Sequence, residues 1–140
     1  MPANTVPIFS KAPDIQWIGY ITAANTTADL TSGTSYLVFT ADATNGGMLS
    51  KIRFRPTPAG NTTATVARVW INNGSTTGTA ANNSLYDEVS LPAVTASGTA
   101  AVAGYEVAFN IPIPAGYRIY ITIHTASANG WQATAIGGKY

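Results

Sequence analysis

The chain has 140 residues, of which 46% are hydrophobic and only 9% charged, and its formal net charge is +1. This length suits a single domain with one core, and the near-zero charge gives no reason to expect a nucleic-acid or membrane partner. Because the sequence contains no cysteine, a disulfide framework and a zinc-thiolate centre are both excluded. A surface with so few charges has little electrostatic protection against association, which suits a protein that works within an assembly.

Residues 1–14 are predicted to form an extended N-terminal arm, ahead of one folded domain at residues 15–140. Prolines at positions 2, 7 and 13 disfavour a helix in the arm. Ile8 and Phe9 have no strand of their own, so we interpret them as an apolar anchor that attaches the arm to a neighbouring molecule. The first residues lack the basic and apolar regions of a signal peptide, and no apolar run reaches membrane-spanning length. We therefore expect a soluble protein made in the cytoplasm.

Four strands are predicted in the first half of the domain, at residues 15–23, 36–42, 48–55 and 65–72. The first has apolar side chains on both faces, which indicates a strand that is covered on both sides. An Asn-Gly-Gly turn signal follows the second strand. The second and third strands are therefore expected to pair as a hairpin.

The third strand carries a row of basic side chains. Lys51, Arg53 and Arg55 alternate with Ile52 and Phe54, so the two sets lie on opposite faces of the strand. Burial of three unpaired cations would be prohibitive, and we therefore expect the basic row to face outward. We interpret it as a set of charge contacts with acidic groups on a partner protein or on a second subunit.

Four more strands are predicted, at residues 85–91, 105–111, 117–124 and 131–136. The third of these has the clearest signal, because its isoleucines and its polar residues alternate strictly, as in a half-buried central strand. Eight short strands, turn-rich loops and no helical period predict an all-β fold, a single eight-stranded antiparallel β-sandwich of the jelly-roll type. An immunoglobulin-like sandwich with one extra strand is the alternative.

The residues that could carry chemistry do not form a recognisable site in the sequence. Asp87 and Glu88 are adjacent on a strand and point to opposite faces, so they cannot act as a glycosidase pair. His124 is the only histidine, and no local motif supplies the nucleophile and carboxylate of a triad. The loop from Asp42 to Gly46 lacks the distal glutamate of a calcium loop, and we interpret it as a turn. No catalytic residue, metal or cofactor is therefore predicted.

A jelly roll would place its second, seventh, fourth and fifth strands side by side in one sheet. This order gathers five aromatic and basic residues on one outer face, namely Arg68, Trp70, Tyr86, Arg118 and Tyr120. Arginine and aromatic residues are typical of interface centres, so we predict a subunit interface centred on Trp70, in a homodimer or against a larger partner. The alternative is that these side chains stack on one another as a partly solvated row on the surface and form no interface.

The other two tryptophans are interpreted differently. Trp17 and Trp131 have apolar neighbours in the sequence and are expected in the core. Three tryptophans could also build a sugar-binding platform, which keeps a carbohydrate-binding module as a second interpretation.

Several stretches of the chain together resemble a known family. They are M-P-A-N-T at the start, V-W-I-N-N-G-S, L-Y-D-E-V, I-P-A-G-Y-R-I and the final A-I-G-G-K-Y, and in them the chain resembles the capsid cement (decoration) proteins of tailed bacteriophages such as those of Bordetella. The resemblance implies a non-enzymatic jelly-roll subunit on the outer surface of the virion. It implies the major capsid protein as partner and dimers that bridge adjacent capsomers. A tail-fibre or carbohydrate-binding module that recognises host glycans is the rival interpretation.

Overall fold

The computed structural model describes residues 10–27 and 29–140. These residues form eight β-strands and one short 3-10 helix: β1 (Ala12–Ile21), β2 (Tyr36–Thr40), β3 (Gly47–Pro56), β4 (Thr65–Asn72), η1 (Ala80–Asn82), β5 (Asn83–Leu91), β6 (Tyr105–Ile113), β7 (Arg118–Ile123) and β8 (Trp131–Lys139). Within this described part of the chain, no helix is long and apolar enough to span a membrane. The predicted all-β class is confirmed.

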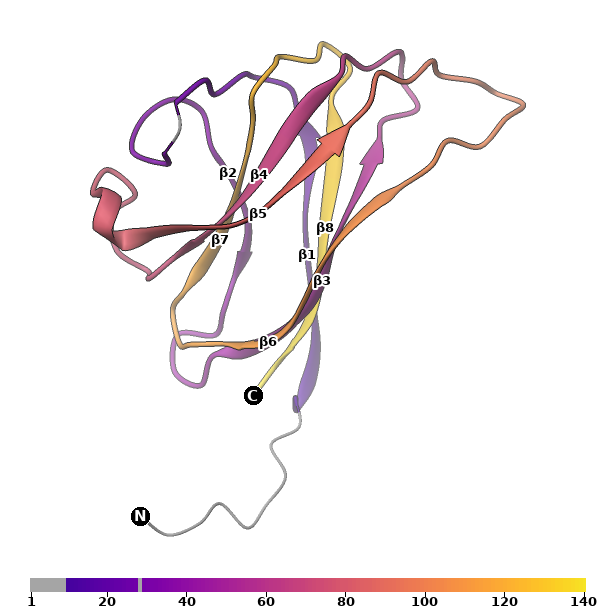
Figure 1. Ribbon diagram of the computed structural model, residues 1–140. Coiled ribbons are helices and arrows are strands. Elements are labelled where there is room, and N and C mark those ends of the chain that lie inside the picture. The colour runs from indigo at the N-terminus through magenta and orange to yellow at the C-terminus, as the bar shows by residue number, and fades with distance from the viewer. Residues whose placement is uncertain (1–9, 28) are drawn as a thin grey trace, which may run out of the picture.

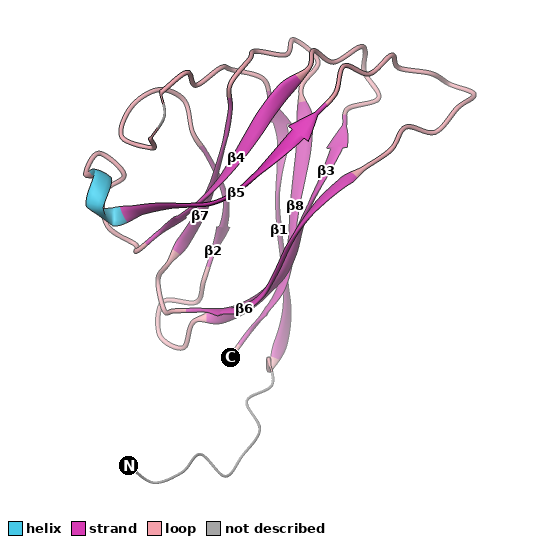
Figure 2. Cartoon of the chain, in the orientation of Figure 1, coloured by secondary structure: helices cyan, strands magenta, loops and turns pink. Residues whose placement is uncertain are grey.

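The strands form two four-stranded sheets that face each other, as Figure 1 and Figure 2 show. Sheet A has the order β1-β8-β3-β6 and sheet B the order β2-β7-β4-β5, and all neighbouring strands are antiparallel. This is the strand order of a jelly roll. The predicted sandwich is therefore confirmed, including the side-by-side placement of the second, seventh, fourth and fifth strands.

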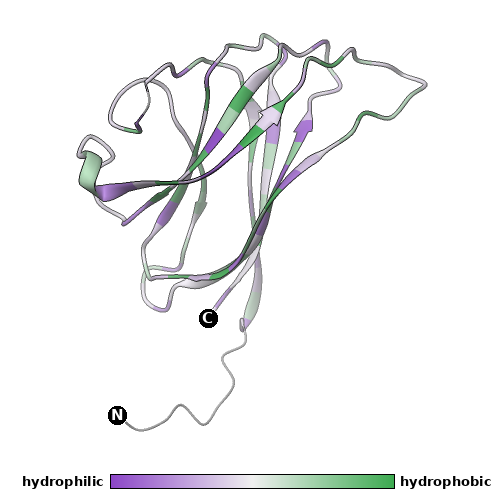
Figure 3. Ribbon diagram, in the orientation of Figure 1, coloured by the Kyte–Doolittle hydropathy of each residue, from purple (hydrophilic) through white to green (hydrophobic). Residues whose placement is uncertain are grey.

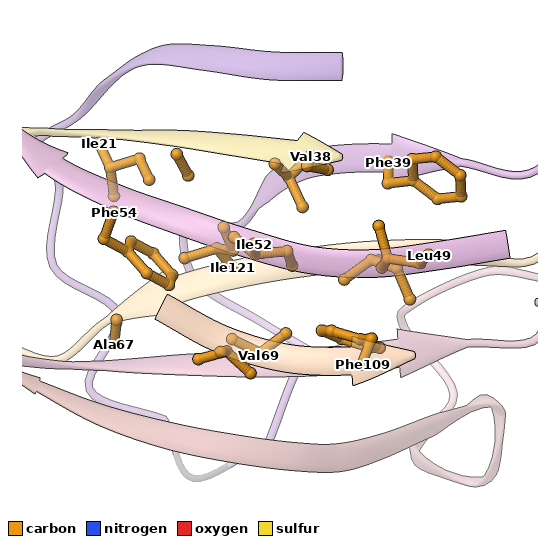
Figure 4. Close-up of a cluster of buried hydrophobic side chains, with 14 of the residues drawn as sticks. Ile21, Val38, Phe39, Leu49, Ile52, Phe54, Ala67, Val69, Phe109 and Ile121 are labelled. Carbon is orange, nitrogen blue, oxygen red and sulfur yellow. The ribbon is translucent and has the colours of Figure 1, made fainter. Parts of the chain in front are cut away.

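The core fills the space between the two sheets with alternate residues of each strand. In the central strand β7, Ile119, Ile121 and Ile123 are fully buried, as their spacing predicts. Figure 4 shows core side chains from both sheets, and Figure 3 shows hydrophobic and hydrophilic segments alternating along the strands. Trp131 is also fully buried, as expected. Each such side chain contributes about 1.5–3 kcal/mol through its removal from water.

The expected hairpin between the second and third strands is wrong. β2 belongs to sheet B and β3 to sheet A, so the connection between them crosses from one sheet to the other. The turn itself is present, since Gly46 adopts φ +74°, and a β-carbon at Gly46 would lie 2.5 Å from the carbonyl oxygen of Ile113. An Asn-Gly signal predicts a turn, but the pairing of the flanking strands depends on the partners that other strands offer.

β1 is an edge strand, and the prediction that it is covered on both sides is wrong. It pairs with β8 alone in sheet A, and three of its large side chains are exposed: Ile15 at 53%, Trp17 at 70% and Tyr20 at 59%. Trp17 is therefore not a core residue. Pro13 lies within β1, which fits an edge position because proline cannot donate a hydrogen bond to a second neighbour.

β1 begins earlier than the sequence predicts. Ala12 pairs with Lys139 and Asp14 with Gly137 of β8, so the strand starts before the expected boundary at residue 15. The expected anchor, Ile8 and Phe9, lies outside the described residues. Its role in attachment stays a prediction.

Gln16 joins the two sheets at one edge of the sandwich. Its Nε2 donates a hydrogen bond to the carbonyl oxygen of Thr40 in β2 (2.9 Å), and its Oε1 accepts one from the Thr40 N–H (2.9 Å). The same Nε2 also donates to the Asp14 carboxylate (3.1 Å). Because Gln16 engages both backbone groups of Thr40, its amide takes the place that the peptide unit of a neighbouring strand would occupy.

Candidate interaction surfaces

The residues that could carry chemistry stay apart in the fold. In the described ranges, no group of three or more His, Cys, Asp or Glu side chains is placed to hold a metal ion. Glu88 lies on the outer face of sheet B beside Arg68, whereas Asp87 is in register with the inward-facing Val69. The two carboxylates therefore do not flank a common substrate bond, in agreement with the sequence.

His124 is exposed directly after β7. It lines an open apolar depression of about 590 Å³ together with residues at the ends of three strands, including Thr65, Leu91 and Tyr105. No carboxylate of the described residues lines this depression, so nothing there orients the imidazole as a general base. The interpretation of His124 as an exposed strand-end residue fits this placement.

Two surface aspartates stabilise turns. The backbone N–H groups of Asn45 (2.9 Å) and Thr44 (3.0 Å) donate to the Asp42 carboxylate and hold its pKa below the ordinary value. The hydroxyl (2.6 Å) and backbone N–H (3.0 Å) of Thr31 donate to the Asp29 carboxylate and lower its pKa in the same way. The interpretation of the Asp42 loop as a turn thus agrees with the structure.

A row of large side chains crosses the outer face of sheet B. The strand register places Tyr120 of β7 beside Trp70 of β4, with Leu37 of β2 and Leu85 of β5 at the two ends. Both leucines are 46% exposed. Neither leucine was among the predicted interface residues, because their exposure follows from the edge positions of β2 and β5.

Two arginines flank this row on the same face. Arg118 is in register with Asn72 on one side of the row, and Arg68 is in register with Thr122 on the other. The Arg68 Nε donates a hydrogen bond of 2.7 Å to the Glu88 carboxylate. Four of the five predicted interface residues, Arg68, Trp70, Arg118 and Tyr120, therefore share one outer face. An intersubunit contact on this face stays a prediction.

Trp70 faces outward but is not bare, so the expectation that it offers an open interface centre is wrong. Only 4% of its surface is exposed, and its indole N–H donates to the Thr122 hydroxyl (3.1 Å). Among the described residues, Trp70 and Leu30 are the two buried hydrophobic residues outside the core cluster. Figure 1 shows the loop between β1 and β2, which contains Leu30, on the sheet B side of the molecule. The subunit therefore covers Trp70 by itself.

Tyr86 faces the core, so its predicted place on the outer surface is wrong. Its ring stacks on Phe109 of β6 (centroids 4.1 Å apart, interplanar angle 14°), and its hydroxyl donates to the carbonyl oxygen of Ala108 (2.9 Å). The cause is a β-bulge, since Trp70 pairs with Leu85 and Tyr86 is the extra residue of β5. The bulge reverses the alternation, so Leu85 faces outward beside Trp70.

The predicted basic row lies on the outer face of sheet A. Lys51, Arg53 and Arg55 alternate with buried core residues along β3, as the sequence indicates. Glu106 of β6 is shared by two of them, with its Oε1 3.0 Å from the Lys51 Nζ and 4.0 Å from the Arg53 Nε. Exposed ion pairs of this kind contribute only about 0–1 kcal/mol. The contact of this row with acidic groups on a partner stays a prediction.

The exposed apolar side chains of β1 share this outer face with the basic row. Trp17 is in register with Thr134 of β8, and Thr134 is in register with Arg53 of β3. Ile15 and Tyr20 extend the apolar area along β1. The sequence analysis missed this group because the apolar residues on both faces of β1 were interpreted as a strand with protein packed against each face. The proline near the start of the strand is the signal that could have identified an edge.

No protein-family model matches the chain, and no curated protein matches its sequence. Among solved structures, the chain is similar to a chain in the structure of infectious bursal disease virus, Gx strain, with 17% identity and a TM-score of 0.34 over 94% of this chain and 34% of that one. A chain in the structure of the Gt strain of the same virus gives 16% identity and a TM-score of 0.26 over 90% and 32%. This chain spans about a third of the length of the solved chains that it matches. TM-scores this low do not establish a common fold.

Proposed function

We propose that this chain is a non-enzymatic structural protein of a tailed-phage virion, a cement protein that binds the major capsid protein on the outer surface of the shell and stabilises the contacts between capsomers. The observation that carries the proposal is the outer face of sheet A, where exposed aromatic and aliphatic side chains lie beside a basic row. Monomeric proteins seldom expose such groups together, and a protein partner would cover them. The stretches that resemble phage cement proteins support the same function.

The mechanism needs no reaction step. A subunit that binds across a seam between capsomers binds the intact shell more tightly than the separated parts, so mass action stabilises the shell by the difference in binding free energy. A homodimer would present two shell-binding faces and could bridge two capsomers.

The test is the addition of the purified chain, gold-labelled, to phage particles that lack it. A cement protein is expected to coat the head in many copies and to raise the temperature at which heads rupture. Electron microscopy locates the label, and release of encapsidated DNA measures rupture. Label on the tail, or heads with an unchanged rupture temperature, would contradict the proposal.

A carbohydrate-binding module is the second candidate, and one observation favours it. Trp17 and Tyr20 are both exposed on β1, and exposed aromatic rings can stack on sugar rings. Titration of the chain with host surface polysaccharide, followed by NMR of the Trp17 indole, distinguishes the two functions. A shift of the Trp17 resonance at submillimolar sugar, without binding to heads, would favour the module.

A further inference from the structure

The charges of the chain are divided unevenly between its two sheets. Sheet A and its ends carry five basic and two acidic residues, a formal charge of +3, namely Lys11, Lys51, Arg53, Arg55, Lys139, Asp14 and Glu106. Sheet B and the loops beside it carry two basic and three acidic residues, a formal charge of −1, namely Arg68, Arg118, Asp29, Asp87 and Glu88. Asp42 lies in the connection between the two sheets, where the charge of Lys139 acts on its carboxylate. The molecule is thus polarised, with a positive side and a negative side. Electrostatic attraction would therefore steer a partner with an acidic surface toward sheet A.

The apolar group on β1 is held on one face by an irregularity in the strand. The register between β1 and β8 shifts between Ile18 and Ile21, and both of these side chains lie toward the core. The extra residue places Tyr20 on the outer face together with Trp17, although the two are three positions apart. The exposed apolar area therefore runs along the strand from Ile15 to Tyr20.

The basic row beside this area is only partly neutralised. Lys51 and Arg53 share the single carboxylate of Glu106, and Arg55 forms no ion pair with any described residue. On sheet B, by contrast, Arg68 is paired with Glu88 at 2.7 Å. The outer face of sheet A thus combines exposed aromatic side chains on its edge strand β1 with excess positive charge on the inner strand β3. Aromatic residues and arginine are both enriched at protein interfaces.

We infer that the outer face of sheet A is the face that binds the shell, and that the shell surface beneath it is apolar opposite β1 and acidic opposite β3. This inference rests on the proposed function and adds the orientation of the subunit. Trp17 is the main apolar contact, with Ile15 and Tyr20 beside it, and Arg53 and Arg55 bind carboxylates of the major capsid protein. Sheet B, with its negative balance and its covered Trp70, then faces solvent.

Two matched variants on opposite faces test the orientation. Trp17→Ser removes the largest exposed side chain of edge strand β1 in sheet A, and Leu37→Ser removes an exposed side chain of edge strand β2 in sheet B. We expect Trp17→Ser to weaken binding to purified heads about thirtyfold, because a large aromatic contact is lost. Leu37→Ser is expected to change binding less than about threefold. Co-sedimentation with heads that lack the chain measures both affinities.

Two controls accompany these variants. Thermal melting by circular dichroism verifies that each variant is folded. Arg55→Glu changes a half-buried position on the same face and provides a second disruption of binding whose effect on folding is independent of that of Trp17→Ser. Hydroxyl-radical footprinting of the wild-type chain adds a direct readout. Oxidation of Trp17 and Tyr20 should fall on binding to heads, while oxidation of Leu85 should stay unchanged.

The outcomes separate this inference from the proposed function. Wild-type chain that does not bind heads would overturn both. Binding by the wild type that Trp17→Ser and Arg55→Glu leave intact, or protection of Leu85 in place of Trp17, would overturn the orientation and leave the proposed function standing. Loss of adhesion to host cells with intact head binding in Trp17→Ser would identify the apolar area as a glycan platform and would also overturn the inference.

Discussion

Trp70 shows how a residue on the outside of a sheet can still contribute to folding. Replacing Trp70 by Ala is expected to lower the free energy of unfolding by about 3 kcal/mol, because a nearly buried indole is removed and leaves a cavity. Trp70→Phe keeps most of the apolar area and loses the hydrogen bond to Thr122, so the free energy of unfolding is expected to fall by about 1 kcal/mol. Urea unfolding followed by circular dichroism measures both variants. Equally small losses in the two would show that Trp70 is not covered within the subunit.

Asp42 makes the stability of the domain depend on pH. The N–H groups of Asn45 and Thr44 lower its pKa in the folded state, and unfolding removes them. Because the pKa of Asp42 is lower in the folded chain than in the unfolded chain, its carboxylate adds to the free energy of unfolding at pH values above the unfolded-state pKa. This contribution is lost as the pH falls through the folded-state pKa. The urea midpoint should therefore fall between about pH 6 and about pH 3, and it should fall less in Asp42→Asn, whose amide oxygen accepts the same bonds without titrating. An identical fall in both proteins would exclude this role for Asp42.

The facing of single residues could be predicted wherever the strands are regular. Ile119, Ile121 and Ile123 alternate without interruption, and their burial follows from the spacing. Tyr86 and Leu85 lie at a bulge, where the alternation reverses. A bulge depends on how the partner strand is placed, and one strand's sequence does not contain that information.

At the scale of strands, Tyr86 closes the open side between β5 of sheet B and β6 of sheet A. Tyr86→Ala is expected to lower the free energy of unfolding by about 2–3 kcal/mol, because the stacking on Phe109 and the hydrogen bond to Ala108 are both lost. Leu85→Ala, at the neighbouring exposed position, is expected to cost less than about 1 kcal/mol. Guanidinium unfolding of the pair measures the difference. A larger loss for Leu85→Ala would show that the bulge is misplaced.

At the scale of strands, the basic row on β3 is expected to make head binding depend on the salt concentration. Replacing Lys51, Arg53 and Arg55 together by Gln should flatten the dependence of head binding on ionic strength, because charges at a rim act mainly on the association rate and are screened by salt. Arg118→Gln on sheet B is the control and should leave the dependence as it is. Binding measured across a salt series provides the comparison. If the triple variant shows the same dependence of head binding on ionic strength as the wild type, the basic row makes no charge contact with the shell. It would then be a solvated row that discourages aggregation.

The existence of strands was predictable, whereas their neighbours were not. Eight alternating or apolar segments correspond to the eight strands of the structure, because periodicity is a local property. Two predictions about neighbours were wrong, namely the hairpin between β2 and β3 and the covering of β1 on both faces. Neither property is local. Sheet membership depends on contacts between residues that are distant in the sequence, so a turn signal or an apolar face does not identify the strand on the other side.

At the scale of the whole molecule, two deletions separate attachment from folding. Removal of residues 1–9 is expected to leave the melting temperature nearly unchanged and to weaken head binding, since Ile8 and Phe9 are the predicted anchor. Removal of residues 1–14 also deletes the start of β1 and the Asp14 carboxylate that accepts from Gln16, so the melting temperature should fall as well. Calorimetry and co-sedimentation measure the two effects. A lower melting temperature with unchanged binding in the shorter deletion would refute the attachment role.

The overall jelly roll could be derived from the number and spacing of the strands, but the candidate surface could not. Lys51, Arg53 and Arg55 were placed outward correctly because cations are costly to bury. Trp17 was placed inward because apolar residues usually are. Its exposure arises from the position of β1 at the edge of sheet A, a property of the assembled sandwich.

The link between Gln16 and Thr40 also has a mechanical consequence. Ala12 pairs with Lys139, so a force that pulls the two ends of the domain apart acts across the β1–β8 ladder and opens it one pair at a time. Opening would proceed from Ala12 to Gln16 and then meet two additional hydrogen bonds that tie Gln16 to the opposite sheet. Gln16 is thus expected to resist the separation of β1 from β8 at this point of the ladder.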